Sequence, residues 1–207
     1  MVPVEMLVFS DFLSPWCYVG ASRMAEAIAP YGTNVEVDWR SYLLYPEPTL
    51  LSTQELATQQ EAWSDAAQLE PRLSIRPWTT SQPRPTHSFP AALAAKVANG
   101  FGPNLGAAFA ERLFVAHFGE HQRISDRDVL VDVAQDAGIA SGRFMMAWRA
   151  SENVLGAEVW RDHHSAQQSG ISEVQAVVVN RTWLLAGLRT VSAYREVIDL
   201  ALGKNAQ

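Results

Sequence analysis

The order in which strand-forming and helix-forming segments follow one another restricts the fold of this sequence more than any other feature. The apolar run Met6–Ser10 predicts a buried strand. Ser14 and Pro15 then supply a helix N-cap and a first helical residue, so we expect a helix that ends near Pro30. The alternation at Val35–Leu44 predicts a second strand. The chain therefore begins as strand, helix, strand.

Helical signals dominate from Ser52 to about Gln168. Strand character returns only at Val174–Val179 and Trp183–Ala186, which are joined by a turn at Asn180-Arg181. Ser192–Leu202 closes the chain as an amphipathic helix. The second half of the chain thus consists of a helical block followed by strand, strand, helix.

This order divides a sheet into two parts with helices inserted between them, which is the plan of a thioredoxin-like α/β fold with a large helical insertion. We expect residues 1–50 and 170–207 to form the thioredoxin-like domain and residues 51–169 to form the inserted helical domain. Hydrophobic residues make up 48% of the chain and charged residues 18%, a composition that can supply a sizeable core.

Within the helical block, local signals predict where individual helices start and stop. Ser52 and Glu55 have the spacing of a capping box, and Ser125 with Asp128 predicts another helix start. Pro71–Pro85 is polar and rich in proline, so we expect a loop there. Gly138 and Gly170 each follow a helical pattern and predict its end.

Charge and cysteine content narrow the range of functions. A net charge of −6 argues against a general nucleic-acid binder, which needs a basic face to displace counterions. One cysteine excludes an internal disulfide framework and a cysteine-rich metal site, so we expect no metal centre. The N-terminus lacks the pattern of a signal peptide, and no apolar run approaches the roughly 18–20 residues that cross a bilayer, so we expect a cytoplasmic protein without membrane contact.

The candidate site is Ser14-Pro15-Trp16-Cys17, directly after the first strand. As third helical residue, Cys17 would lie near free backbone N–H groups and the positive end of the helix dipole. That environment favours a thiolate and lowers a cysteine pKa below its free value of about 8.5. The alternative is structural: Ser14 is an N-cap only, and Cys17 is a small buried hydrophobic residue.

The segment Phe9–Gly20 resembles the active-site segment of DsbA-type proteins of the FrnE group, whose usual form contains Cys-Pro-Trp-Cys. The resemblance continues through Leu43–Pro46 and Ile124–Asp126 and into the closing strand-strand-helix unit, so it covers nearly the whole chain. It implies the thioredoxin-like fold and a thiol-disulfide oxidoreductase ancestry.

Two positions depart from the family pattern. Ser14 stands where the family has its attacking cysteine, and a dithiol cycle needs two sulfurs, so we do not expect an ordinary disulfide oxidase. Gln175 stands where the family has a cis-proline, and a cis bond before a non-proline residue costs about 2.5–4 kcal/mol, so trans is favoured for the Val174–Gln175 bond unless the site imposes cis, and the sequence leaves the isomer open. The resemblance implies that the backbone of residue 174 pairs with a bound thiol.

Two related families carry serine at the first motif position: the kappa-class glutathione transferases and the 2-hydroxychromene-2-carboxylate isomerases. The resemblance to them implies that Ser14 holds a glutathione sulfur, which is physically reasonable for a hydroxyl donor at a helix N-terminus. Those families place Ser-Asp or Asn-Asp after the glycine of the last hairpin, whereas here Gly187 precedes Leu188-Arg189-Thr190.

We expect mainly structural roles for the other polar and aromatic residues that could take part in chemistry. Asp11 can buffer a proton for Ser14 or Cys17, but we expect it chiefly to satisfy loop amides. Trp16 should flank the site. The pair His163-His164 points about 100° apart on a helix, which suits packing or surface roles better than chelation.

Three functional hypotheses remain open. The first is an enzyme that acts on or with a low-molecular-weight thiol such as glutathione or mycothiol, in which Ser14 holds the thiolate, Cys17 forms a mixed disulfide, and a pocket between the two lobes takes an apolar substrate. Asp11, Pro15, Trp16, Val174 and Gln175 would then contact the thiol or substrate. The second is a non-catalytic family member that binds a ligand or protein, and the third is a thiol-dependent transferase or isomerase that uses Ser14. A homodimer is compatible with each.

Overall fold

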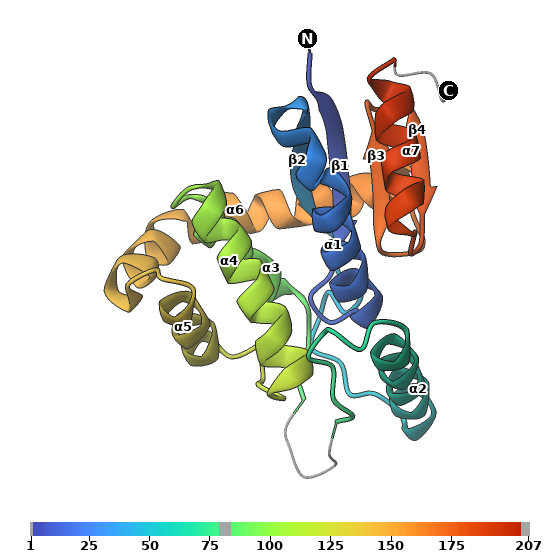
Figure 1. The fold of residues 1–207 in the computed structure, drawn as a ribbon. Coiled ribbons are helices and arrows are strands. Elements are labelled where there is room, and N and C mark those ends of the chain that lie inside the picture. Colours follow the sequence, from blue (N-terminus) through green and yellow to red (C-terminus); the bar gives the residue numbers. More distant parts are fainter. Residues whose placement is uncertain (1, 79–83, 204–207) are drawn as a thin grey trace.

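The computed structural model describes residues 2–78 and 84–203. Four strands form one mixed sheet in the order β2-β1-β3-β4, in which β1 runs parallel to β2 and antiparallel to β3, and β3 runs antiparallel to β4 (Figure 1). Their bounds are β1 Val4–Ser10, β2 Val35–Ser41, β3 Ala176–Val179 and β4 Trp183–Ala186. This order confirms the thioredoxin-like sheet that the sequence predicts.

Helices fill the intervals in the expected order. Those of the described residues are α1 Pro15–Ile28, the 3-10 segment η1 Ala29–Asn34, α2 Thr53–Leu69, α3 Phe89–Asn99, α4 Pro103–Phe114, the π-helical turn η2 Val115–Gly119, α5 Arg127–Asp136, α6 Ser141–Gln168 and α7 Val191–Ala201. The large α-helical insertion between β2 and β3 is therefore confirmed. The division at residues 50/51 and 169/170 stays a prediction.

Both faces of the sheet are covered by helices. On one face α1 and α7 pack side by side, and Met24, Tyr194 and Ile198 meet the valines of β1 and β3 (Figure 1). On the other face the C-terminal end of α6 passes behind the sheet, where Ala166 and Ile171 contact Phe9 and Ala176. The end of β1, where the candidate site begins, is thus enclosed from both sides.

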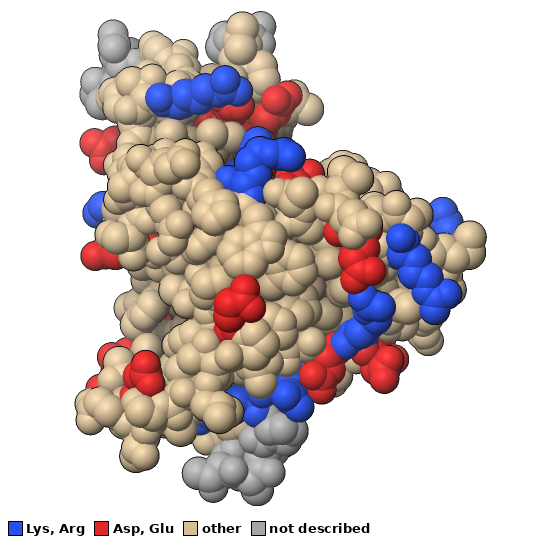
Figure 2. Space-filling model, turned by 180° about the vertical axis from the view of Figure 1, so that it is seen from behind, with Lys and Arg blue, Asp and Glu red and all other residues tan. Residues whose placement is uncertain are grey.

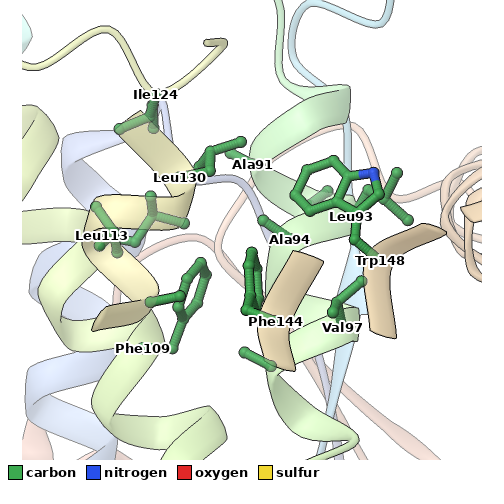
Figure 3. Packing of buried hydrophobic residues seen from close by; sticks show 14 of the residues in the cluster. Ala91, Leu93, Ala94, Val97, Phe109, Leu113, Ile124, Leu130, Phe144 and Trp148 are labelled. Carbon is green, nitrogen blue, oxygen red and sulfur yellow. The ribbon is translucent and has the colours of Figure 1, made fainter. Parts of the chain in front are cut away.

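The inserted helices have a core of their own, shown in Figure 3. Phe109 and Leu113 of α4 and Phe144 and Trp148 of α6 are almost wholly buried in it, against the alanine-rich helix α3. Alanine side chains let helices approach closely while still burying apolar surface. This core holds the inserted helices together as one packed unit.

A third apolar cluster joins the helical insertion to the start of α1. It brings Cys17 and Tyr18 of α1 together with Trp63 of α2, Phe114 of α4 and Phe118 of η2. The rings of Tyr18 and Phe114 stack with centroids 5.0 Å apart. The candidate site therefore lies at the contact between the sheet and the insertion.

A buried acid fixes α6 to β2 and α3. The carboxylate of Asp162 accepts from Arg40 at 3.0 Å and from the Ser41 backbone N–H at 3.1 Å, and it lies 2.7 Å from the Lys96 ammonium group. Next to it, Nδ1 of the buried His163 accepts from the Leu43 backbone N–H at 3.1 Å. Because burial also lowers the pKa of His163, the ring is neutral and serves as an acceptor. The packing role expected for His163 is confirmed.

Helix N-caps agree with the sequence at two places and differ at one. Ser14 caps α1, and Ser52 with Glu55 forms a complete capping box on α2. The expected start at Ser125 is wrong, because Asp126 is the N-cap residue of α5. The Ser125 hydroxyl instead accepts from the Thr86 backbone N–H at 3.4 Å and donates to Asp126, so it joins two loops.

Charged side chains on the surface lie in mixed groups. On the face shown in Figure 2, basic side chains lie next to acidic ones. Ion pairs between elements include Arg112 with Glu120 and Asp136, and Arg127 with Glu152. Within the described residues, no helix combines the length and apolar character needed to span a membrane, and no three His, Cys, Asp or Glu side chains gather as metal ligands.

Candidate active site

Asp11 organises the loop between β1 and α1. Its carboxylate accepts from the backbone N–H groups of Leu13 at 2.7 Å and Leu44 at 2.6 Å, so it joins this loop to the segment after β2. Its own backbone N–H points to the Cys17 sulfur at 3.4 Å. The expectation that Asp11 satisfies loop amides is confirmed.

Burial of Asp11 makes the stability of the protein depend on pH. Burial raises the pKa of Asp11 from 3.8 to about 6, partly offset by hydrogen bonds from Ser88, Leu13 and Leu44. The folded state thus holds this proton more tightly than the unfolded state. We expect this carboxyl to make the free energy of unfolding fall by about 2 kcal/mol as the pH rises from about 4 to about 7.

The test is urea unfolding at a series of pH values for the wild type and for Asp11→Asn, which has no carboxyl to titrate. The difference between the two curves isolates Asp11 from other groups. A wild-type curve with the same slope as the Asn variant would show that Asp11 does not titrate in this range.

Ser14 ends the loop and begins α1. Its Oγ accepts from the Cys17 backbone N–H at 3.3 Å, and its side chain is almost wholly buried. Pro15 follows as the first helical residue and is buried, whereas Trp16 is half-buried and packs against the cluster that contains Cys17. The capping bond uses a lone pair of Oγ, and the hydroxyl hydrogen is directed to the Cys17 sulfur.

Cys17 is the third residue of α1, as expected, but it is not a poised thiolate. The residue is fully buried, and burial raises the pKa of its thiol to about 11. Donors at Asp11, Ser10 and Ser14 reduce this rise without reversing it. The expectation of a lowered pKa at the helix end is therefore wrong, because loss of water around the sulfur outweighs the helix dipole.

The Val174–Gln175 segment lies opposite α1. Val174 packs against the cluster that contains Cys17, and the wholly buried Gln175 places its amide against Gly20. The Val174–Gln175 peptide bond, whose isomer the sequence leaves open, is cis. The preference of an isolated peptide bond for trans does not decide it, because the segment is enclosed between α1 and the start of β3.

The contact between Gly20 and Gln175 requires a residue without a side chain. A Cβ on Gly20 would lie 1.7 Å from Oε1 of Gln175, whose two amide atoms are buried without a hydrogen-bond partner. We expect Gly20→Ala to lower the free energy of unfolding by about 1–3 kcal/mol. In a Gln175→Ala background the same substitution should be neutral or stabilising by up to about 1 kcal/mol, since alanine favours helices over glycine.

A double-mutant cycle from urea unfolding measures this coupling. Gly142→Ala in α6 is the control, because a Cβ there meets nothing within 4 Å. Additive effects of the Gly20 and Gln175 substitutions would contradict the contact.

The hairpin end does not supply the serine-aspartate or asparagine-aspartate pair of the transferase-like families. Gly187 is followed by Leu188 and Arg189, and Thr190 caps α7 by accepting from the Ala193 backbone N–H at 3.2 Å. The Arg189 carbonyl accepts from Arg23 of α1 at 3.4 Å. This segment therefore ties α7 to α1.

The predicted site residues lie together at the start of α1: Asp11, Ser14, Pro15, Cys17 and Val174. Gln175 lies one turn further along this helix, against Gly20. Sequence reasoning missed three rings that lie beside Leu13: Trp63, Trp78 and His117, from α2, the following loop and η2. No spacing connects these residues in the sequence, so only the folded chain shows that they meet.

Comparison with known proteins places this geometry in a family context. The family model for the DSBA-like thioredoxin domain matches residues 5–199. The protein YwbO of Bacillus subtilis, which is described as uncharacterized, is 28% identical over 186 residues, covering 86% of this chain and 88% of that protein.

Solved structures with the same fold include two of bacterial oxidoreductases. A probable DsbA oxidoreductase from Streptomyces coelicolor aligns with a TM-score of 0.79 and 23% identity, covering 99% of this chain and 92% of that one. The cytosolic disulfide reductase DsbM from Pseudomonas aeruginosa aligns with a TM-score of 0.76 and 21% identity over 96% and 98%, and DsbM has also been solved with GSH. At these identities the structural likeness establishes the fold.

Proposed function

This chain belongs to the family of DSBA-like thioredoxin domains, and on that premise we propose that it is a thiol-dependent enzyme in which Ser14 holds the sulfur of a low-molecular-weight thiol. The family resemblance expected from Phe9–Gly20 is confirmed by the match over residues 5–199. In this chain Ser14 replaces the first cysteine of the family's active site, so its chemistry must differ from that of a dithiol enzyme.

The position of Ser14 carries the proposal. Its hydroxyl stands at the N-terminus of α1, where the helix dipole favours negative charge. The cap uses only the oxygen as acceptor, so the hydroxyl can turn its hydrogen from the Cys17 sulfur to a bound thiolate. A hydrogen bond to a charged group contributes about 1.5–3 kcal/mol, enough to favour the thiolate of a bound thiol.

Cys17 has a supporting role in this proposal. It is the single cysteine of the chain, so no dithiol cycle can run within it. Its sulfur is fully buried and its pKa is raised to about 11, so we do not assign it a mixed disulfide. Its sulfur contacts the loop before α1 through the Asp11 backbone N–H.

Glutathione and mycothiol are the thiols we would test first. The likeness to DsbM, a protein solved with GSH, supports the choice of glutathione. We expect such a reaction in the cytoplasm, where low-molecular-weight thiols are kept reduced.

A second candidate is a family member that binds a ligand without catalysis. The burial of both Ser14 and Cys17 favours it, because a thiol can reach Ser14 only if its surroundings move. In this case binding would not depend on the sulfur of the ligand.

Calorimetric titration with glutathione and with S-methylglutathione distinguishes the two candidates. We expect the wild type to bind glutathione more tightly than its methylated form, and Ser14→Ala to remove that preference with a loss of about tenfold or more in glutathione affinity. Ser22→Ala, in the same helix, is the control. Mycothiol is titrated in parallel.

Equal affinities of Ser14→Ala and the wild type for glutathione, or no binding of either thiol, would contradict the thiol-dependent proposal. Because the substitution also removes a cap worth about 1 kcal/mol, circular dichroism and the melting temperature must show that the variant is folded.

A further inference from the structure

A small cavity lies beside Leu13, next to the loop that presents Ser14. Its volume is about 20 Å³, which is enough for one water-sized group. The lining residues that bear on the argument are Leu13, Gln59, Trp63, Trp78, Arg84 and His117. They come from the loop before α1, from α2, from the segments on either side of residues 79–83 and from η2.

Three aromatic rings form one wall of this cavity. The Trp63 ring lies 5.5 Å from that of Trp78 and 5.1 Å from that of His117, and Trp78 and His117 are 5.4 Å apart. Each ring is therefore in contact distance of the other two.

Two polar atoms in this wall have no partner. Nε1 of Trp63 and Nδ1 of His117 form no hydrogen bond in the described structure. The two residues are only 3% and 4% exposed, so solvent does not reach these atoms either. An indole N–H that loses water without gaining an acceptor costs about 1–3 kcal/mol. Because both residues line the cavity, a group placed there can satisfy them.

Arg84 brings a positive charge to the same cavity. Its guanidinium group donates to the neutral amides of Gln59 at 2.9 Å and Gln60 at 3.3 Å, and lies 5.4 Å from the centre of the Trp78 ring. Among the described residues no carboxylate acts on its charge, and residues 79–83 contain no acid in the sequence. Burial lowers the pKa of Arg84, and no neighbouring acid raises it again. The positive charge of Arg84 is therefore not compensated by a described residue.

We propose that this cavity binds one carboxylate oxygen of a small organic acid. Arg84 compensates the negative charge, and the Trp63 N–H donates to the oxygen that enters the cavity. Arginine pairs well with carboxylates, and an indole N–H is a donor that only an acceptor can satisfy. Burial lowers the pKa of His117 to about 3, so this ring stays neutral and does not repel or attract the ligand by charge.

This site is separate from the proposed role of Ser14. Leu13 lines the cavity and precedes Ser14, so a ligand bound here lies beside the start of α1 without needing a thiol. The cavity holds only one water-sized group, so the rest of the acid lies outside it. A bridging water between Trp63 and His117 is the competing occupant.

Calorimetric titration with benzoate and with benzyl alcohol, its neutral counterpart, tests the proposal. We expect the wild type to bind benzoate at least about tenfold more tightly than benzyl alcohol, and Arg84→Met to remove that difference. Trp63→Phe keeps a ring but loses the N–H, so it should weaken benzoate about fivefold or more. Arg72→Met is the charge-matched control, because Arg72 pairs with Glu70 and Glu26 and does not line the cavity.

Three results would overturn the proposal: no benzoate binding to the wild type at millimolar concentration, equal binding of benzoate and benzyl alcohol, or unchanged benzoate affinity in Arg84→Met. The first means that the cavity holds water only. Because Trp63 is buried, the conclusion rests on Arg84→Met if Trp63→Phe fails to fold. Ser14→Ala should bind benzoate normally, so failure here and failure of the thiol proposal are distinguishable.

Discussion

Iodoacetamide should alkylate Cys17 of the folded protein at neutral pH at least about 300-fold more slowly than a free cysteine. The thiolate is the reacting species, and a pKa of about 11 instead of about 8.5 lowers its fraction by this factor. Lack of access slows the reaction further, since the sulfur is fully buried. Mass spectrometry of timed samples measures the rate.

Two controls make this result specific to the fold. The protein unfolded in urea should react at the rate of a free thiol. A Cys17→Ser variant that carries Ser165→Cys, at an exposed position of α6, should react at that rate while folded. Rapid alkylation of Cys17 in the folded wild type would show that its thiol is accessible and ionised. Cys17 would then again be a candidate catalytic residue.

Asp162→Ala should be the most destabilising single substitution considered for this chain, with a loss of about 3–5 kcal/mol in the free energy of unfolding. The substitution leaves Lys96, whose side chain is only 10% exposed, and Arg40 without their buried partner. It also removes the acceptor for the Ser41 backbone N–H. The contact that holds α6 to β2 and α3 is lost with it.

Urea unfolding measures the effect, with Asp38→Ala as the matched control. Asp38 pairs with the same Arg40 but is 44% exposed, so its loss should change stability by less than about 1 kcal/mol. Equal effects of the two substitutions would mean that the buried network contributes no more than a surface ion pair.

The sequence predicts the fold well where local signals decide. The strand at β1, the cap at Ser14 and the capping box at Ser52 each depend on residues within a few positions of one another, and each is confirmed. Ser125 shows where local signals fail: its hydroxyl accepts from Thr86, 39 positions away, so it is not free to cap α5.

The chemistry of the site could not be predicted in the same way. The helix dipole at Cys17 is a local feature, but the burial that raises its pKa comes from Trp63, Phe114 and Phe118, which are distant in sequence. Likewise, the enclosure of Gln175 depends on Gly20 of α1. The cavity beside Leu13 escapes sequence reasoning for the same reason.

If Ser14 stabilises a bound thiolate, the pKa of the bound glutathione thiol shows it most directly. Ultraviolet absorbance of the thiolate, followed against pH for the complex, gives this value. We expect the bound thiol of the wild type to titrate at least about one unit below its free value of about 8.5, since one unit corresponds to 1.36 kcal/mol and the Ser14 hydrogen bond contributes about 1.5–3 kcal/mol. In Ser14→Ala the bound thiol should titrate near the free value, whereas an unshifted pKa in the wild type, or an equal shift in both proteins, would contradict the account.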